Sequence, residues 1–415
     1  MNLYGYWSKP FVETVRANLL YFTPFFRPLG GLIYWGLYSV FGLNPLPFRI
    51  VCFALLLFNI FLLYKLAVAI TGSKETGLLT ALLGSHHAGY ADLYFNSGTI
   101  YDLLVFFFFT LTMYLYVAKH RAIYVVLAFL CAINAKEMAV TLPVVLLLYE
   151  LIFNRPILTF SGLKSWFLDR VWIVFLLGLL LLPYIYGKLG SGNLSGNPAF
   201  ALNLSVPYYL TNSGRYMDVL LFQPLGWTTA KFLALFIFSM FALAAVLRSR
   251  VLFFCCLFFL LTPLPIIFIA FRGSLYLLYI PMIGLTLFVA TVIVRIRELA
   301  SGSPALTFAT VFLVLFWVHD RHRPIGNEVP AFRSTLNQLS ALHLQPKPGA
   351  RILMLEDPFD TDEWAPVFIG RILYNDKELV VDRIKMMNQK PTAAEIQAYD
   401  YVLAYENGQL RLAEK

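Results

Sequence analysis

Apolar residues dominate the chain from Phe48 to Val318 and fall into long runs with few charges. A helix needs about 20 apolar residues to cross a bilayer, and only helices and closed barrels satisfy the backbone in lipid. The alternating pattern of a barrel is absent, so the sequence predicts an all-α polytopic membrane bundle. The candidate spans are residues 48–70, 75–91, 99–118, 171–187, 232–247, 251–271, 275–294 and 304–318.

A further apolar stretch, residues 122–153, is interrupted by Lys136 and Glu137. Both of its flanks are basic, and the positive-inside rule places basic loops in the cytoplasm. The stretch must then cross an even number of times, which predicts two short helices that go in and come back, with the charged pair at the tip. Each helix would be about 20 Å long and too short to span alone, so it should pack inside the bundle. One long helix is the alternative, and it would break the charge rule.

The same rule assigns the other short basic loops to the cytoplasm and the remaining loops to the outer side. Residues 1–47 form an extracytoplasmic segment whose short apolar helix, 29–43, is expected to lie flat at the outer interface. Residues 48–319 form the transmembrane helical bundle. Residues 320–415 carry more charge and contain strand-like runs, RILML, ELVVD and YVLAYE, after a helical pattern. They predict a small soluble α/β domain on the outer side.

Composition agrees with this class and excludes others. Hydrophobic residues make up 59% of the 415 and charged residues 13%, against roughly 45–50% apolar residues in globular proteins. The net charge of +9 comes mostly from residues that flank spans, and no basic patch with interleaved aromatics indicates nucleic-acid binding. The four cysteines lie in apolar runs without disulfide or zinc spacing. Motifs of serine hydrolases, P-loop ATPases and zinc metalloproteases are missing.

A few charges interrupt the apolar runs, and the predicted topology puts them all at the outer face. The pattern singles out Asp92, Asp102, Lys136, Glu137 and Arg272. A charge in lipid is costly and marks a functional site by default, so their convergence indicates a polar reaction chamber. The carboxylates are candidates to accept a proton from a hydroxyl or to hold a divalent ion. Helix capping or solvation is the alternative.

Each of the two cations, Lys136 and Arg272, has two possible roles. Lys136 either contacts a phosphate or forms a self-neutralising pair with its neighbour Glu137. Arg272 either clamps a phosphate or snorkels to the interface. His86 and His87 are candidates for substrate or metal binding, although adjacent histidines on a helix point in different directions; polar helix ends facing water are the alternative. The acidic run LEDPFDTDEW is either a cation site or a solvated loop.

Four landmarks follow one another along the chain: RPLGGLIYWGLYSVFGLNPLPFRIV, HHAGYADLYFNSGTIYD, AKEMAVTLPVVLLLYELIF and LYIPMIG. In this order they resemble the GT-C integral-membrane glycosyltransferases, nearest to the protein O-mannosyltransferase-like and aminoarabinose transferase-like branch. His87, Asp92 and Asp102 keep the spacing of the second family landmark. Lys136 and Glu137 match the family's S/A-K-E motif. Tyr279, Ile280, Pro281 and Gly284 match Y-L-P-x-x-G, whereas Arg272 lies farther from the tyrosine than the family's arginine.

The resemblance implies an inverting transfer of a sugar from a polyisoprenyl-phosphate donor to a protein, glycan or lipid acceptor outside the cytoplasm. It makes Asp92, Asp102 and Glu137 the expected catalytic residues. Arg27, His87, Lys136 and Arg272 are expected to bind substrate and lipid phosphate, and a divalent metal remains a candidate cofactor. Relatives carry a span and an acidic pair before the RPL helix, which leads us to expect an N-terminally truncated or inactive member.

A secondary transporter and a non-catalytic membrane scaffold are the competing functions. Transporters show inverted repeats and broken midplane helices; the sequence has no repeated half, and the charges that it singles out lie near the outer rim. The short loops and the lack of organelle signals suit a bacterial inner membrane with the C-terminal domain in the periplasm.

Overall fold

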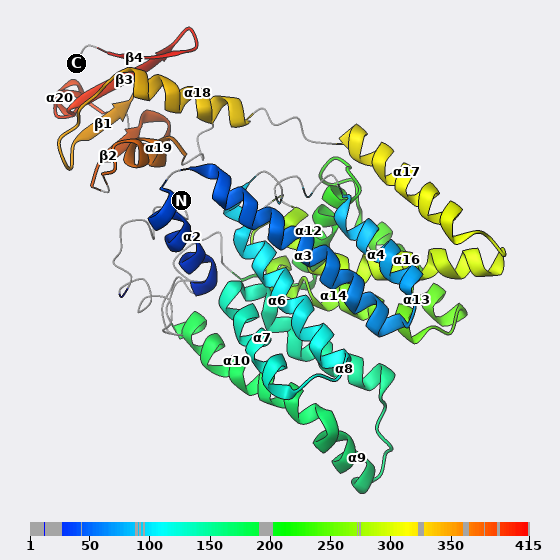
Figure 1. The fold of residues 1–415 in the computed structure, drawn as a ribbon. Coiled ribbons are helices and arrows are strands. Elements are labelled where there is room, and N and C mark those ends of the chain that lie inside the picture. Colours follow the sequence, from blue (N-terminus) through cyan, green and yellow to red (C-terminus); the bar gives the residue numbers. More distant parts are fainter. Residues whose placement is uncertain are drawn as a thin grey trace. The chain divides into compact units, whose positions relative to one another are not determined.

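In the computed structural model the described residues are 12, 27–42, 44–87, 90, 93, 96–190, 202–271, 273, 275–322, 328–359, 365–376, 378–387 and 391–413. The chain divides into a helical unit, Val12–Pro324, and a second unit that contains Met1–Phe11 and Ile325–Lys415 (Figure 1). The sequence placed this boundary between residues 319 and 320. In the structure the last helix of the first unit runs on to His322, past the end of the apolar run.

The first unit contains helices joined by short loops. They are α2 (Pro28–Phe41), α3 (Pro45–Thr71), α4 (Lys74–Ser85), α6 (Ile100–Val117), α7 (Ala122–Ala135), α8 (Leu142–Phe153), α9 (Phe160–Trp166), α10 (Trp172–Gly190), α12 (Val206–Leu220), α13 (Ala230–Val246), α14 (Arg250–Leu261), α15 (Leu264–Ile267), α16 (Pro281–Leu299) and α17 (Pro304–His322). Shorter turns are η3 (Glu137–Thr141) and η6 (Leu275–Leu278), and a π-helical segment, η4 (Phe167–Val171), connects α9 to α10.

Among the described residues, four helices are long and apolar enough to cross a membrane: Pro45–Thr71, Ile100–Val117, Phe160–Gly187 and Arg250–Ile267. The other predicted spans are helical but do not reach that length and apolarity. The sequence did not indicate α12, which lies between the spans predicted at 171–187 and 232–247. Its sequence, VPYYLTNSGRYMDVL, alternates apolar and polar residues at helical spacing, so it contains no long apolar run.

The stretch 122–153 breaks as predicted. Helix α7 ends at Ala135, Lys136 is extended (φ −162°, ψ 153°), and α8 begins one 3-10 turn later. Pro143 in the first turn of α8 favours a new helix start there, because the first turn needs no backbone N–H from it. Lys136 bonds to the first turn of α6, whereas Tyr149 of α8 lies 6.5 Å from Tyr116 in the last turn of α6. The stretch therefore goes in and comes back.

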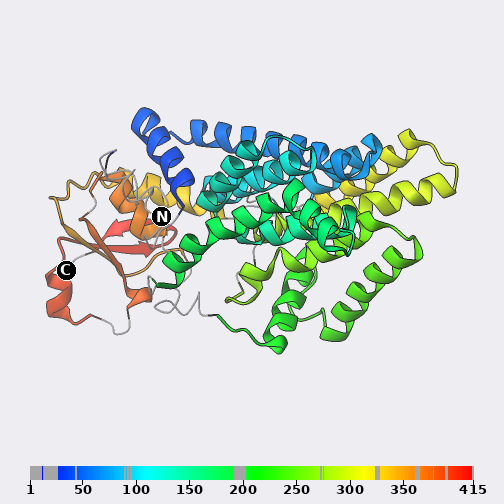
Figure 2. The same cartoon turned by 90° about the horizontal axis from the view of Figure 1, so that it is seen from below.

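Helix α2 packs against α3, α6 and α7 at one end of the bundle (Figures 1 and 2). Its small residues permit the close approach: a Cβ at Gly30 would lie 2.2 Å from the Tyr101 ring of α6. Tyr34, one turn later, is buried and its ring lies 5.7 Å from the same tyrosine. This contact fixes the start of α2, and with it Arg27, over the first turn of α6.

The second unit is a four-stranded sheet in the order β2-β1-β3-β4. Strands β1 (Arg351–Met354), β2 (Val380–Arg383) and β3 (Tyr401–Glu406) are parallel, and β4 (Gln409–Leu412) pairs antiparallel with β3. The first three coincide with the predicted strand runs. Helices α18 (Glu328–Ala341), α19 (Ala365–Leu373) and α20 (Ala393–Gln397) complete the described elements of this unit.

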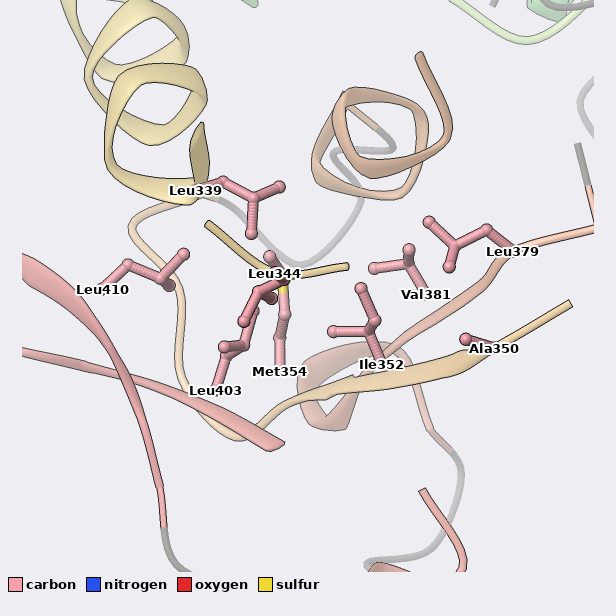
Figure 3. Close-up of a cluster of buried hydrophobic side chains, with 9 residues drawn as sticks. All are labelled: Leu339, Leu344, Ala350, Ile352, Met354, Leu379, Val381, Leu403 and Leu410. Atoms are coloured by element: carbon pink, nitrogen blue, oxygen red, sulfur yellow. The ribbon is translucent and has the colours of Figure 1, made fainter. Parts of the chain in front are cut away.

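The core of this sheet follows the alternation of side chains along a strand. Ile352 and Met354 of β1 face α18 and α19, where they pack with Leu339, Val381 and Leu403 (Figure 3). The intervening residue of β1, Leu353, belongs to a second cluster on the other face with Tyr399 and Val402. Both faces are covered, as a parallel sheet requires.

Candidate functional site

Four charged side chains from three segments of the helical unit meet at one end of the bundle. Asp102 lies in the first turn of α6, and Arg27 directly precedes α2. Lys136 and Glu137 occupy the break between α7 and α8. The extended backbone at Lys136 sends consecutive side chains to opposite sides. Lys136 therefore reaches α6, while Glu137 reaches the start of α2.

The inner pair is buried. The Lys136 ammonium donates to Asp102 Oδ1 at 2.5 Å, and the two side chains are only 6% and 8% exposed. The ammonium also lies 5.5 Å from the centre of the Tyr276 ring in η6, a cation–π contact. Because water is excluded here, each charge depends on its partner, and removing either one leaves the other uncompensated.

The outer pair is partly open to solvent. Arg27 donates from Nε to Glu137 Oε2 at 3.1 Å and from Nη2 to Oε1 at 2.5 Å, the bidentate geometry of a guanidinium on a carboxylate. About one third of each side chain is exposed, 33% and 32%. The guanidinium lies 5.6 Å from the Tyr101 ring centre, and Tyr184 of α10 is near enough to interact electrostatically with both charges.

These pairs decide one alternative that the sequence left open. Lys136 and Glu137 do not neutralise each other, because each pairs with a residue on a different helix. The site therefore presents two cations and two carboxylates, a buried pair behind a more exposed one. The buried pair fixes the start of α6 to the helix break, and the outer pair is the part that a polar ligand can reach.

The structure treats the other predicted site residues differently. Asp92 and Arg272 lie outside the described residues. His87 lies just past the end of α4. Its ring stacks on Phe222 with the ring centres 4.8 Å apart, and Nε2 lies 2.9 Å from the Leu220 carbonyl oxygen. Phe222 in turn stacks on His322, the last residue of α17, at 4.2 Å.

An aromatic series connects this histidine region to the charged cluster. Tyr90 lies 5.7 Å from His87 and 5.1 Å from Tyr279. Tyr279 stacks on Phe106 at 3.8 Å, one turn past Asp102 on α6. The rings of His86 and His87 have different neighbours, since His86 contacts Phe312. In the part of the chain that the structure describes, no three His, Cys, Asp or Glu side chains are placed to hold one metal ion.

Sequence reasoning missed charges within the apolar runs, and two of them lie well inside the runs. Lys65 of α3 lies with its ammonium 5.7 Å from the Tyr114 ring centre, near the end of α6. Glu150 of α8 is 1% exposed and accepts a hydrogen bond from Asn154 at 3.0 Å. Both lie at the end of the bundle opposite Asp102, so the statement that every charge within the runs lies at one face is wrong. A count of charges residue by residue through each run would have found them.

Tyr276 and Tyr184 were also missed as parts of the site, and the sequence holds little signal for them among 24 tyrosines. The acidic run of the C-terminal unit is only partly described. Its Asp357 is buried and paired with Arg383 at 2.7 and 2.9 Å, while Asp360, Asp362 and Glu363 lie outside the described residues. Asp357 is thus bound to a protein cation.

No protein-family model, curated protein or solved structure matches this chain.

Proposed function

We propose that the protein is a membrane glycosyltransferase of the GT-C type, which moves a sugar from a polyisoprenyl-phosphate donor to an acceptor hydroxyl on the extracytoplasmic side. The observation that carries the proposal is the convergence of Arg27, Glu137, Lys136 and Asp102 at one end of an apolar helical bundle. A lipid-linked phosphate enters from the membrane and needs a cation at the surface, and a hydroxyl nucleophile needs a nearby carboxylate. The cluster offers both.

The two ion pairs differ in solvent exposure, and this difference suggests different roles for their cations. A donor phosphate that replaces Glu137 on Arg27 exchanges one anion for another where both partners already meet water. Replacing Asp102 on Lys136 would leave a carboxylate buried without a partner, at a cost of several kcal/mol, about 3–5 in comparable pairs. We therefore assign Arg27 to the phosphate and Lys136 to positioning.

The released Glu137 is then the candidate base. The acceptor oxygen attacks the anomeric carbon as its proton passes to the carboxylate, and the bond from that carbon to the phosphate oxygen breaks. The electron pair leaves with the polyisoprenyl phosphate, whose charge Arg27 balances. A single displacement of this kind inverts the anomeric carbon. Asp92 is the alternative base that the sequence landmarks indicate.

The first test is binding of radiolabelled undecaprenyl phosphate to the detergent-purified chain, with undecaprenol as the uncharged comparison. Hydrogen bonds to a charged group contribute about 1.5–3 kcal/mol, so Arg27→Gln should weaken phosphate binding roughly 10- to 100-fold. Arg49→Gln is the matched control, because Arg49 is exposed in the first turns of α3 near the same end. Equal binding by both variants would contradict the assignment.

The second test is transfer of a radiolabelled sugar from undecaprenyl phosphate to the lipid, glycan and protein fractions of membranes. Glu137→Gln keeps the shape of the side chain and should retain carrier binding while losing transfer. Binding without transfer by the native chain would refute the enzyme and favour a scaffold or a lipid transporter. The proposed location is a bacterial inner membrane with the C-terminal unit in the periplasm.

A further inference from the structure

The helix that contains η4 is longer than a bilayer requires. Phe160–Gly187 is a run of 28 residues, about 42 Å at 1.5 Å per residue, against a hydrocarbon core of about 30 Å. Helix α6, with 18 residues, is about 27 Å long and close to that thickness. About 12 Å of the longer helix must therefore lie outside the hydrocarbon, tilt strongly or bend.

Contacts with neighbouring helices show which end projects. Tyr184 of α10 lies near Arg27 and Glu137, at the end of the bundle where α6 begins. Arg170 donates from Nη1 to the Tyr116 carbonyl at 3.2 Å, in the last turn of α6. Residues 160–169 precede this level, so they extend about 15 Å beyond the end of α6. Figure 1 shows α9 continuing away from the ends of the neighbouring helices.

This projecting segment has the composition of a helix at a membrane interface. Leu158 and Phe160 are 88% and 87% exposed, and Leu163, Phe167 and Leu168 are exposed as well. Bulky apolar side chains beyond the hydrocarbon level, next to basic residues, are typical of helices that lie in the headgroup layer. The π-helical segment η4 is a place where such a helix can bend.

The charge on the same surface is strongly one-sided. Within residues 118–122 and 153–172, all of them described, the basic residues are Lys119, Arg121, Arg155, Lys164 and Arg170. The acidic residue in these two segments is Asp169, which accepts a hydrogen bond from the Ser165 hydroxyl. Four of the five basic side chains are exposed, and Arg170 is partly buried over the Tyr116 ring.

We propose that this surface, the turn 118–122 together with residues 153–170, binds the anionic headgroups of phospholipids in the leaflet at this end of the bundle. The exposed apolar residues favour a lipid surface over a soluble acidic partner. Binding of a soluble acidic partner would not explain why bulky apolar side chains are exposed past the end of α6. The site is distinct from the charged cluster at the other end. Lipid binding here would hold the start of α10 and the end of α6 at a fixed depth.

The test measures binding of fluorescent phosphatidylglycerol to the detergent-purified full chain, with unlabelled phosphatidylglycerol and phosphatidylcholine as competitors. Each basic residue near an anionic surface contributes a few-fold, so Arg155→Gln with Lys164→Gln should weaken phosphatidylglycerol binding about tenfold or more. Arg170 is left intact because it holds α6. Moderate salt should abolish the difference between the variants, since exposed charges are screened.

Arg248→Gln with Arg250→Gln is the matched control, because it removes two exposed charges from another basic turn. That variant should bind like the native chain. Arg155→Lys with Lys164→Arg keeps the charge and should also bind, which separates loss of charge from misfolding. An equal loss of phosphatidylglycerol binding in both double Gln variants would mean a general charge effect and would overturn the proposal. Native phosphatidylglycerol binding by the variant with Arg155→Gln and Lys164→Gln would overturn it as well. The readout is lipid binding, so failure here leaves the proposed transfer reaction untouched.

Discussion

Replacing the members of the buried pair one at a time and together tests how the charged cluster is held. The side chains of Lys136 and Asp102 are 6% and 8% exposed, and the ammonium donates to the carboxylate at 2.5 Å. Lys136→Met leaves a buried carboxylate without its cation, and Asp102→Leu leaves a buried ammonium. Removing one partner of a buried pair costs about 3–5 kcal/mol.

The double variant should behave differently from the sum of the singles. With both charges replaced by apolar side chains of similar size, no group remains uncompensated, and comparable replacements are neutral or stabilising by about 1–4 kcal/mol. The double-mutant cycle should therefore give a coupling energy of several kcal/mol. The assay is denaturant unfolding of the detergent-solubilised protein, followed by circular dichroism.

The Glu75–Arg297 pair is the internal comparison. It joins α4 to α16 through two hydrogen bonds from Arg297 to Glu75, and its side chains are 24% and 19% exposed. Because water screens it more, a single replacement there should lose on the order of 1 kcal/mol. If the Lys136 and Asp102 double variant is as unstable as the sum of its singles, the pair is not isolated from solvent and the reasoning is refuted. A stable double variant without transferase activity would show that the pair also serves the reaction.

Further predictions concern helix packing, the second unit and the orientation of the chain. Gly30→Ala should displace α2 and weaken carrier binding, because the new Cβ would overlap a tyrosine ring of α6. Gly36→Ala is the control: its Cβ meets open space, so the variant should be neutral or slightly stabilised in thermal unfolding. Asp357→Asn should destabilise the C-terminal sheet by about 3–5 kcal/mol, because it breaks a fully buried ion pair; hydrogen exchange of β1 and β2 measures this loss, and native protection would contradict it. A membrane-impermeant maleimide should label Asn44→Cys in intact cells but Lys119→Cys only after permeabilisation; labelling of both from one side would refute the topology.

The sequence predicted the position of the break between α7 and α8, but it did not predict which residues Lys136 and Glu137 contact. Basic loops on both sides of residues 122–153 required an even number of crossings, and the structure has the break at the expected pair. The partners could not be read from the chain, because adjacency in sequence favoured a Lys136–Glu137 pair. The deciding fact is the extended backbone at Lys136, which separates the two side chains, and a pattern of apolar residues does not encode it.

Elements without a long apolar run were the other limit of the sequence. Helix α12 carries polar residues along one face and therefore gave no signal of a span. Its Asn212 donates to the Ile267 and Ile269 carbonyls at 2.8 and 2.9 Å. Asp218 of the same helix accepts backbone hydrogen bonds from Gly226 and Thr228 at 2.7 Å. These polar residues satisfy backbone groups of neighbouring segments, a role that only tertiary contacts reveal.

The missed charges show that charged residues within the apolar runs lie at both ends of the bundle, while the charged cluster of the candidate site lies at one end. Lys65 and Glu150 lie beside the last turns of α6, level with the basic loops that the charge rule puts in the cytoplasm. Arg27, Asp102, Lys136 and Glu137 lie at the opposite end, where α6 begins. Charged residues that avoid the middle of α6 and gather at its two ends match the cost of burying charge at the centre of a bilayer. The described clusters at the two ends also differ in kind: where α6 begins, two cations face two carboxylates in direct pairs, while the end where α6 finishes presents an excess of exposed basic side chains. That asymmetry is what the two proposals require, a phosphate leaving group at one end and attachment to anionic lipid at the other.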